Sequence, residues 1–268
     1  MNSSLTAFLA ILCYFASCAV ISLRLFNSDL AQRIPRSLGI ALGFAGVVLH
    51  GLFIYHHAFT HGGINLGFFD AGALVAWTIL LLLLISSLSK PVENLGIVLL
   101  PLAALLVLLD TRYHTSHFLA ADAPWGLRIH VLISLLAYSL LTMASVQAVL
   151  LAVQDHHLRN RHPGGFIRAL PPLQTMEALL FEMIGAGFVL LTVALLSGLF
   201  FLEDMFAQRL VHKTLLSILA WLVFGALLWG RFRSGWRGQK ALIWTLTGFV
   251  VLMLAYFGSK FVLELILQ

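Results

Sequence analysis

Eight long runs of apolar residues constrain this chain more than any other feature of its sequence. A helix needs about 20 mostly apolar residues to cross a bilayer. The runs that meet or approach this length are Leu5–Leu23, Ser37–His57, Phe68–Leu88, Leu95–Leu109, Leu127–Val153, Ala178–Leu202, Leu215–Gly230 and Ala241–Leu267. Backbone amides must be paired in lipid, so such runs fold as helices. The sequence therefore predicts an all-α polytopic membrane protein, with eight transmembrane helices in one integral membrane domain over residues 1–268.

The composition agrees with lipid as the main solvent of the chain. Hydrophobic residues make up 60% of the 268 residues and charged residues 10%, whereas soluble domains are about half apolar and about a quarter charged. The net charge of +5 would suggest nucleic-acid binding in a soluble protein. Here the basic residues lie in short loops, where they act as topology signals. We therefore expect membrane lipid, and no nucleic acid, as a partner.

The basic residues are distributed unevenly between the two sides of the predicted bundle. The odd-numbered loops and their edges hold Arg24, Arg33, Arg36, Lys90, Arg159, Arg161, Arg168, Arg231, Arg233, Arg237 and Lys240. The even-numbered loops and the C-terminal region hold only Arg112, Arg128, Arg209, Lys213 and Lys260. Because cytoplasmic loops are enriched in Lys and Arg, both termini are expected on the outer, periplasmic side. Histidines show the opposite bias: His56, His57, His61, His114, His117, His130 and His212 lie at or beyond the outer helix ends.

Two of these outer histidines open predicted helices. His130 lies in "WGLRIHVLISLLAYSLL" and His212 in "RLVHKTLLSILAW". Neutral imidazole is a ligand for haem iron, zinc and copper, and an imidazole in hydrocarbon is costly without a partner. One hypothesis is that the two side chains converge on one ligand. The other is that each reaches the interface and hydrogen-bonds headgroups or backbone.

Two sequence motifs that would fix the chemistry do not occur. A His-Glu-x-x-His segment, typical of zinc hydrolases, is not present. Neither is Cys-x-x-Cys-His, so the chain is not itself a carrier of covalently attached c-type haem. If the histidines bind iron, the haem is held by coordination alone.

Four stretches, in their order and spacing, resemble the CcsA/HemX-type cytochrome c assembly membrane proteins, and among them a YpjD-like inner-membrane subgroup. They are "HGGINLGFFDAGALVAW", "WGLRIHVLISLLAYSLL", "GFVLLTVALLSGLF" and "GWRGQKALIWTLTGF", and they cover most of residues 61–257. The resemblance implies a multi-pass protein of the bacterial inner membrane that handles haem at the outer face. It also implies that His130 matches a haem-ligand position and that His61 matches a histidine of that family. We expect haem b as the cofactor, with His130 as a ligand of its iron and His212 or His61 as the opposite ligand.

The sequence departs from that family in the Trp-rich segment that presents haem for attachment. Between the sixth and seventh runs it reads "FLEDMFAQRLVHKTLLSILAW", with no tryptophan before Trp221. The last run also ends without the histidine of that family. We therefore expect an accessory haem-binding protein rather than a complete haem lyase, with cytochrome-maturation or haem-biosynthesis proteins as partners. Two alternatives remain open: a HemX-type regulator of haem biosynthesis that binds no haem, and a haem or metal transporter.

Overall fold

The computed structural model of this chain is built almost entirely of helices. It describes residues 3–58, 63–65, 67–113, 118–120, 124–160, 167, 169–201, 211–258 and 261. Within these ranges eight helices are long and apolar enough to cross a membrane, which confirms the all-helical class and the predicted number of spans. By their contacts the residues divide into two compact units.

Unit 1 comprises Met1–Asp122 and Pro163–Pro171, and unit 2 comprises Ala123–His162 and Pro172–Gln268. The elements of unit 1 are α1 (Ser3–Phe26), α2 (Ser28–Arg33), α3 (Arg36–Ala58), β1 (Gly63–Asn65), α4 (Phe68–Ser89), η1 (Glu93–Leu95), α5 (Gly96–Arg112) and β2 (Phe118–Ala120). Those of unit 2 are α6 (Trp125–Arg159), α7 (Leu173–Phe201), α8 (Val211–Ser234), α9 (Gln239–Met253) and a π-helical turn, η3 (Leu254–Gly258). The prediction of one membrane domain over residues 1–268 stays a prediction.

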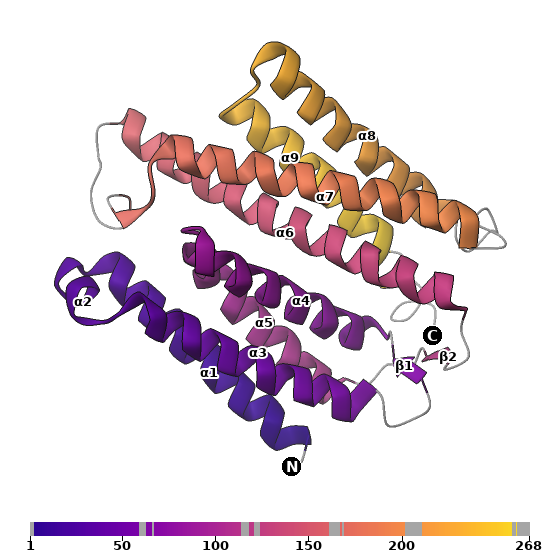
Figure 1. Cartoon of the computed structure of the whole chain (residues 1–268), viewed down its shortest axis with the longest axis horizontal. Coiled ribbons are helices and arrows are strands. Elements are labelled where there is room, and N and C mark those ends of the chain that lie inside the picture. The colour runs from indigo at the N-terminus through magenta and orange to yellow at the C-terminus, as the bar shows by residue number, and fades with distance from the viewer. Residues whose placement is uncertain are drawn as a thin grey trace. The chain divides into compact units, whose positions relative to one another are not determined.

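In unit 1 the four spans form a closed ring of neighbours. Helix α1 packs against α3 and α5, and α4 packs against the same two helices (Figure 1). The closest approach is at Gly46 of α3, where a Cβ would lie 2.6 Å from the ring of Tyr14 in α1. Beside this contact the Tyr14 hydroxyl and His50 Nδ1 are hydrogen-bonded at 3.0 Å. Both side chains are fully buried, so the interior of this bundle contains a polar pair.

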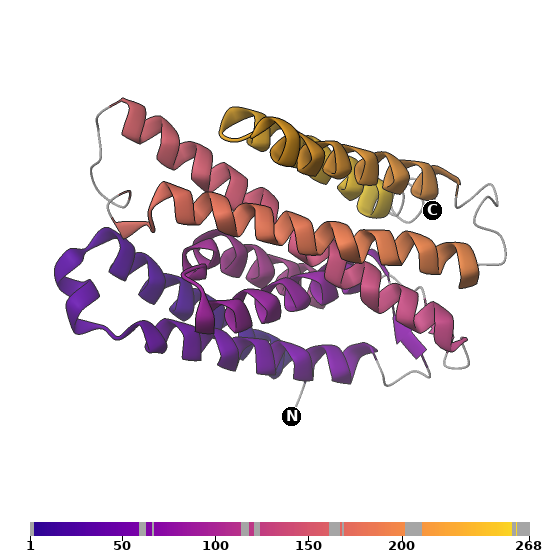
Figure 2. The same cartoon turned by 45° about the horizontal axis from the view of Figure 1, so that its top comes forward.

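Unit 2 has the same ring of neighbours. Helix α6 packs against α7 and α9, and α8 packs against α7 and α9; α8 and α9 lie side by side in both views (Figure 1, Figure 2). The α6 face toward its neighbours carries small buried residues, among them Ala137, Ser145 and Ala148. Small residues allow helices to approach closely in membranes. At Gly187 of α7 an added Cβ would lie only 2.8 Å from Leu141 of α6.

Basic side chains secure one end of each unit. In unit 1 the Arg36 guanidinium donates to both carboxylate oxygens of Glu93, at 2.6 and 2.8 Å, and to the backbone carbonyls of Ser87 and Lys90. In unit 2 Arg231, in the last turn of α8, forms an ion pair with Glu177 near the start of α7. These contacts join the helix ends at which the sequence concentrates its arginines and lysines.

Candidate functional site

His130 lies in the second turn of α6 and is held by a residue of α7. Its Nδ1 and the hydroxyl of Ser197 are 2.9 Å apart. Ser197 is itself buried, and its hydroxyl donates to the carbonyl of Ala194 at 2.9 Å. Sixty-seven residues separate the imidazole from the hydroxyl in the sequence, and the packing of α6 on α7 brings them together.

This hydrogen-bond chain favours one tautomer of the imidazole. A hydroxyl group has a single proton, and the carbonyl of Ala194 is an acceptor for that of Ser197. We therefore assign the proton of the neutral His130 ring to Nδ1, which then donates to Ser197. In a neutral imidazole the other nitrogen, Nε2, then has the lone pair. A histidine whose Nδ1–H is anchored to the protein and whose Nε2 can coordinate is the usual arrangement of a metal ligand.

A cluster of aromatic side chains lies deeper along the same helix. Tyr138, two turns after His130, contacts Phe249 of α9 and both Tyr256 and Phe257 of η3, with ring centroids 6.0, 6.3 and 5.7 Å away. Two consecutive residues reach one ring because η3 is a wide π-helical turn, a feature that often accompanies functional sites. These rings begin eight residues, or about 12 Å, along α6 from His130, and large flat rings of this kind suit contact with a flat apolar cofactor such as a porphyrin.

The structure places His212 but not His61. His212 is in the first turn of α8 with an exposed side chain. We call this end of unit 2, where α6 and α8 begin and α7 ends, the His130 end. Within the described ranges no hydrogen bond or ring contact joins His212 to His130. His61 lies outside the described residues, as do His114 and His117.

The described part of the chain contains no group of three or more His, Cys, Asp or Glu side chains that could hold a metal ion. Haem iron requires less from the protein, because the porphyrin supplies four nitrogens and the chain only one or two axial ligands. An anchored imidazole of this kind could serve as one such axial ligand.

The polar residues around the helix entry that follows His61 have a structural role. Asn65 donates to Asp70 at 3.0 Å, and its side-chain oxygen accepts from the backbone N–H of Gly67 at 3.0 Å. Asn65 belongs to β1, which pairs antiparallel with β2, Gly63 opposite Ala120. Asp70, which the sequence places at the start of a span, is thus bound by a neighbour in the first turn of α4.

Sequence reasoning missed Ser197. The residue lies in the quoted stretch "GFVLLTVALLSGLF", where a single serine in an apolar run has no distinguishing pattern. Its only signal in the sequence is the free-energy cost of a hydroxyl group in hydrocarbon, because such a group needs a hydrogen-bond partner. Glu182, an acidic residue within a membrane-length helix, has an exposed side chain on α7.

Trp221 also has a defined place. Its ring stacks on Phe188 with centroids 5.5 Å apart, and its indole N–H donates to Thr192 at 2.8 Å. Both partners are on α7, so this half-buried tryptophan of α8 packs between helices. It does not supply the Trp-rich presenting surface that the sequence lacks between the sixth and seventh runs.

Comparisons with known proteins agree on one family. The sequence pattern described as "Cytochrome C assembly protein" matches residues 38–267. Inner membrane protein YpjD of Escherichia coli K12 is 32% identical over 266 residues, 97% of this chain and 98% of the relative. Cytochrome c biogenesis protein CcsA of Chlamydomonas reinhardtii is 29% identical over 149 residues, 54% of this chain and 40% of the relative. No solved structure matches the chain.

The two kinds of match extend beyond short motifs. The family pattern begins at residue 38, within α3 of unit 1, and the YpjD match covers nearly the whole chain. With the eight membrane-length helices, the YpjD match confirms the predicted location, a multi-pass protein of the bacterial inner membrane. The chain belongs to the cytochrome c assembly protein family and is a YpjD-like member of it.

Proposed function

We propose that this protein binds haem b at the His130 end of unit 2, with His130 as an axial ligand, and handles haem as an accessory protein of cytochrome c assembly. The observation that carries the proposal is the Ser197 anchor. With the ring proton assigned to Nδ1 and donated to Ser197, the neutral ring keeps its lone pair on Nε2, which is the atom that iron requires. The family, which is named for cytochrome c assembly, supplies the reason for choosing haem.

The second axial ligand is proposed to be His212, with His61 as the alternative. His212 opens α8 at the same end of unit 2 and is exposed, so its side chain is accessible to an incoming cofactor. A bis-histidine site needs imidazoles on opposite faces of the iron. The aromatic cluster around Tyr138 would supply apolar contacts to the porphyrin. When bound, haem would supply the redox-active iron, and the chain would supply its axial nitrogens and its orientation.

The proposed orientation has this site at the periplasmic face. Arg159, Arg231 and Arg233 lie in the last turns of α6 and α8, at the end of unit 2 opposite His130. Because basic residues concentrate on the cytoplasmic side, the His130 end and both termini would be outside. Cytochrome c is attached to haem on that side according to the family resemblance, so partners from cytochrome maturation would meet the site there.

An accessory role is proposed rather than a complete lyase. The segment between α7 and α8 contains no tryptophan, and Trp221 is engaged with Phe188 and Thr192 of α7. A lyase must present haem to two thiols, and in this family a Trp-rich external segment is expected to do so. Retention of a ligand without this surface suits storage or delivery of haem to another protein.

The test is the absorption spectrum of detergent-purified protein from cells grown with excess haem precursor. Wild type should show b-type absorption and His130→Gly should not, and added imidazole should restore it to His130→Gly by occupying the vacated ligand position. Ser197→Ala should still bind haem, with an affinity lower by about 10- to 100-fold, the usual effect of losing a group that orients a metal ligand. His156→Ala, an exposed imidazole near the other end of the same helix, is the matched control and should bind haem like wild type.

Two results would overturn the proposal. One is a colourless wild-type protein that also fails to take up added haem while remaining folded by circular dichroism. The other is a His130→Gly variant with an unchanged spectrum. A change from a six-coordinate to a five-coordinate spectrum in His212→Ala, but not in His61→Ala, identifies His212 as the second ligand. The opposite result identifies His61.

A further inference from the structure

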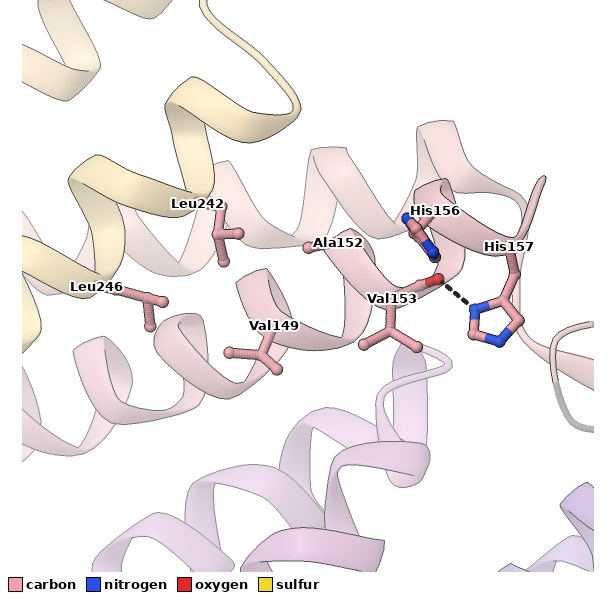
Figure 3. Close-up of a pocket in the computed structure, with 7 residues that line it drawn as sticks. All are labelled: Val149, Ala152, Val153, His156, His157, Leu242 and Leu246. Atoms are coloured by element: carbon pink, nitrogen blue, oxygen red, sulfur yellow. Dashed lines mark hydrogen bonds between the residues drawn. The ribbon is translucent and has the colours of Figure 1, made fainter. Parts of the chain in front are cut away.

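A groove in unit 2 lies away from the His130 end, between the C-terminal turns of α6 and the first turns of α9. Its volume is about 360 Å³, within the range of sites that take small organic ligands. Its apolar part is formed by Val149, Ala152 and Val153 of α6 and by Leu242 and Leu246 of α9 (Figure 3). The groove is open along one side, so that a ligand can enter it from that side.

Two histidines lie at one end of the groove, and nearly all the atoms that line it are carbon. His156 and His157 lie at the end nearer the C-terminus of α6, whereas Val149 and Leu246 lie at the other end (Figure 3). His156 follows Val149 by two helical turns, or about 10 Å. The imidazoles are thus at the end of the groove nearest the last turn of α6.

Hydrogen bonds in the last turns of α6 orient the two imidazoles at this end. The Asn160 amide donates to Nε2 of His156 at 3.0 Å, and we therefore assign the proton of the neutral ring to Nδ1. His157 is oriented by its own backbone bond, with Nδ1 donating to the carbonyl of Val153 at 2.9 Å (Figure 3). Asp155, the acidic side chain of this segment, is paired with Arg159 at 3.0 Å. The guanidinium of Arg159 partly offsets the charge of this carboxylate.

Helix α9 adds positive potential at the same end. It begins at Gln239, directly after Gly238. Leu242, which lines the groove, is only one turn further along. The first N–H groups of a helix carry a partial positive charge and favour anions. Lys240 lies in the same turn with an exposed side chain, so a negative group beside His156 would meet complementary charge.

The occupant of such a groove follows from the surrounding solvent. At membrane depth an apolar groove is in contact with lipid rather than with water, so an acyl chain is the group that fills it. The groups of a phospholipid follow one another in the same order as the residues along the groove. A hydrocarbon chain would lie against the aliphatic residues, and the phosphate would lie at the histidine end. We propose that the groove binds one anionic phospholipid, with an acyl chain against Val149 and Leu246 and its phosphate at His156 and the first turn of α9. This inference is independent of the haem proposal.

The experiment is native mass spectrometry of the full chain released from vesicles. The vesicles contain equal amounts of phosphatidylglycerol and phosphatidylethanolamine with identical acyl chains. Wild type should retain one lipid, with phosphatidylglycerol favoured at least about twofold by the charge complementarity. Ala152→Trp fills the groove and should abolish retention. Ile243→Trp, an exposed position on α9 outside the groove, is its matched control and should retain lipid like wild type.

The headgroup contact is tested separately. His156→Ala should keep a lipid but lose the preference for phosphatidylglycerol, whereas Arg233→Ala, a basic residue at the same membrane end, should keep it. Inorganic phosphate should not compete, because the acyl chain supplies most of the binding. Equal retention by wild type and Ala152→Trp, or equal loss in Ala152→Trp and Ile243→Trp, would overturn the proposal. Haem absorption is expected to be unchanged in Ala152→Trp, so failure here leaves the haem proposal standing.

Discussion

Tyr14→Phe removes one hydroxyl group from the interior of unit 1 and leaves an imidazole there without its partner. The hydroxyl and His50 Nδ1 are 3.0 Å apart and both residues are 0% exposed. Among the described residues, Nε2 of His50 has no hydrogen-bond partner either. The variant therefore buries an imidazole with neither nitrogen bonded.

The expected cost follows from two general magnitudes. Leaving a buried polar group unsatisfied costs about 1–3 kcal/mol in proteins generally. Side-chain hydrogen bonds inside membrane proteins average only about 0.6 kcal/mol and reach about 1.7, because chains unfolded in the membrane also find partners. Complete burial and the lack of a second partner place His50 toward the upper values. We expect Tyr14→Phe to lower the free energy of unfolding by about 1–2 kcal/mol.

A double-mutant cycle with His50→Leu measures this interaction. Each single variant leaves one polar group unpaired, whereas the double variant removes both, so its cost should be smaller than the sum by about 1 kcal/mol or more. The assay is reversible unfolding in mixed dodecyl maltoside and sodium dodecyl sulfate micelles, followed by circular dichroism. Tyr113→Phe removes a hydroxyl from an exposed tyrosine of unit 1 and should change stability by less than about 0.5 kcal/mol. Additive single effects, or a Tyr14→Phe variant as stable as Tyr113→Phe, would refute the reasoning.

Two further changes test the packing and the ion pair. Gly46→Ala should lower the free energy of unfolding by about 1–3 kcal/mol, because the added Cβ would lie 2.6 Å from the ring of Tyr14; the same micelle assay measures it. Glu177→Gln should cost roughly 1 kcal/mol, since its ion pair with Arg231 is partly exposed, with 34% of the arginine side chain and 17% of the glutamate side chain accessible. Salt screening should shrink the second difference at high ionic strength.

The glycine change has a matched control, and the ion-pair change has a contradicting outcome. At Gly185 of α7 an added Cβ would meet nothing within 4 Å. Gly185→Ala should therefore raise stability by about 0.5–1 kcal/mol, the usual gain of alanine over glycine in a helix. If Gly46→Ala stabilises the protein to the same degree, the close approach of α3 to Tyr14 is wrong. If the Glu177→Gln difference is unchanged by salt, the pair contributes through geometry rather than charge.

The sequence was sufficient for the number and type of the spans, because lipid imposes a length and a composition on every helix. It was less reliable at helix ends. The sixth run was predicted to begin at Ala178, but α7 begins at Leu173, because the charge of Glu177 is neutralised by Arg231. The seventh was predicted over Leu215–Gly230, but α8 spans Val211–Ser234. An apolar run in the sequence ends at the first charged residue, whereas the backbone hydrogen bonds of the helix continue beyond it.

The candidate site could be predicted only in part for a similar reason. A histidine in a membrane span can be recognised in the sequence because burying an imidazole in hydrocarbon costs free energy. His130 could therefore be identified as a candidate ligand. Its partner could not, because Ser197 is 67 residues away and only the pairing of α6 with α7 makes them neighbours. The short helix α2, in which Asn27 caps the N–H groups of Asp29 and Leu30, was missed because its six residues carry no long apolar pattern.

The length of α6 has a consequence for the membranes in which this protein can reside. Its 35 residues extend about 52 Å, and even a steep tilt of about 40° leaves roughly 40 Å along the bilayer normal. A hydrocarbon layer of about 30 Å cannot cover this length, so at least the final turns project past it. A thicker or thinner bilayer would then change how many residues of α6 are in contact with water, and the helix would not have to unwind. Tolerance of such thickness variation is therefore built into the fold.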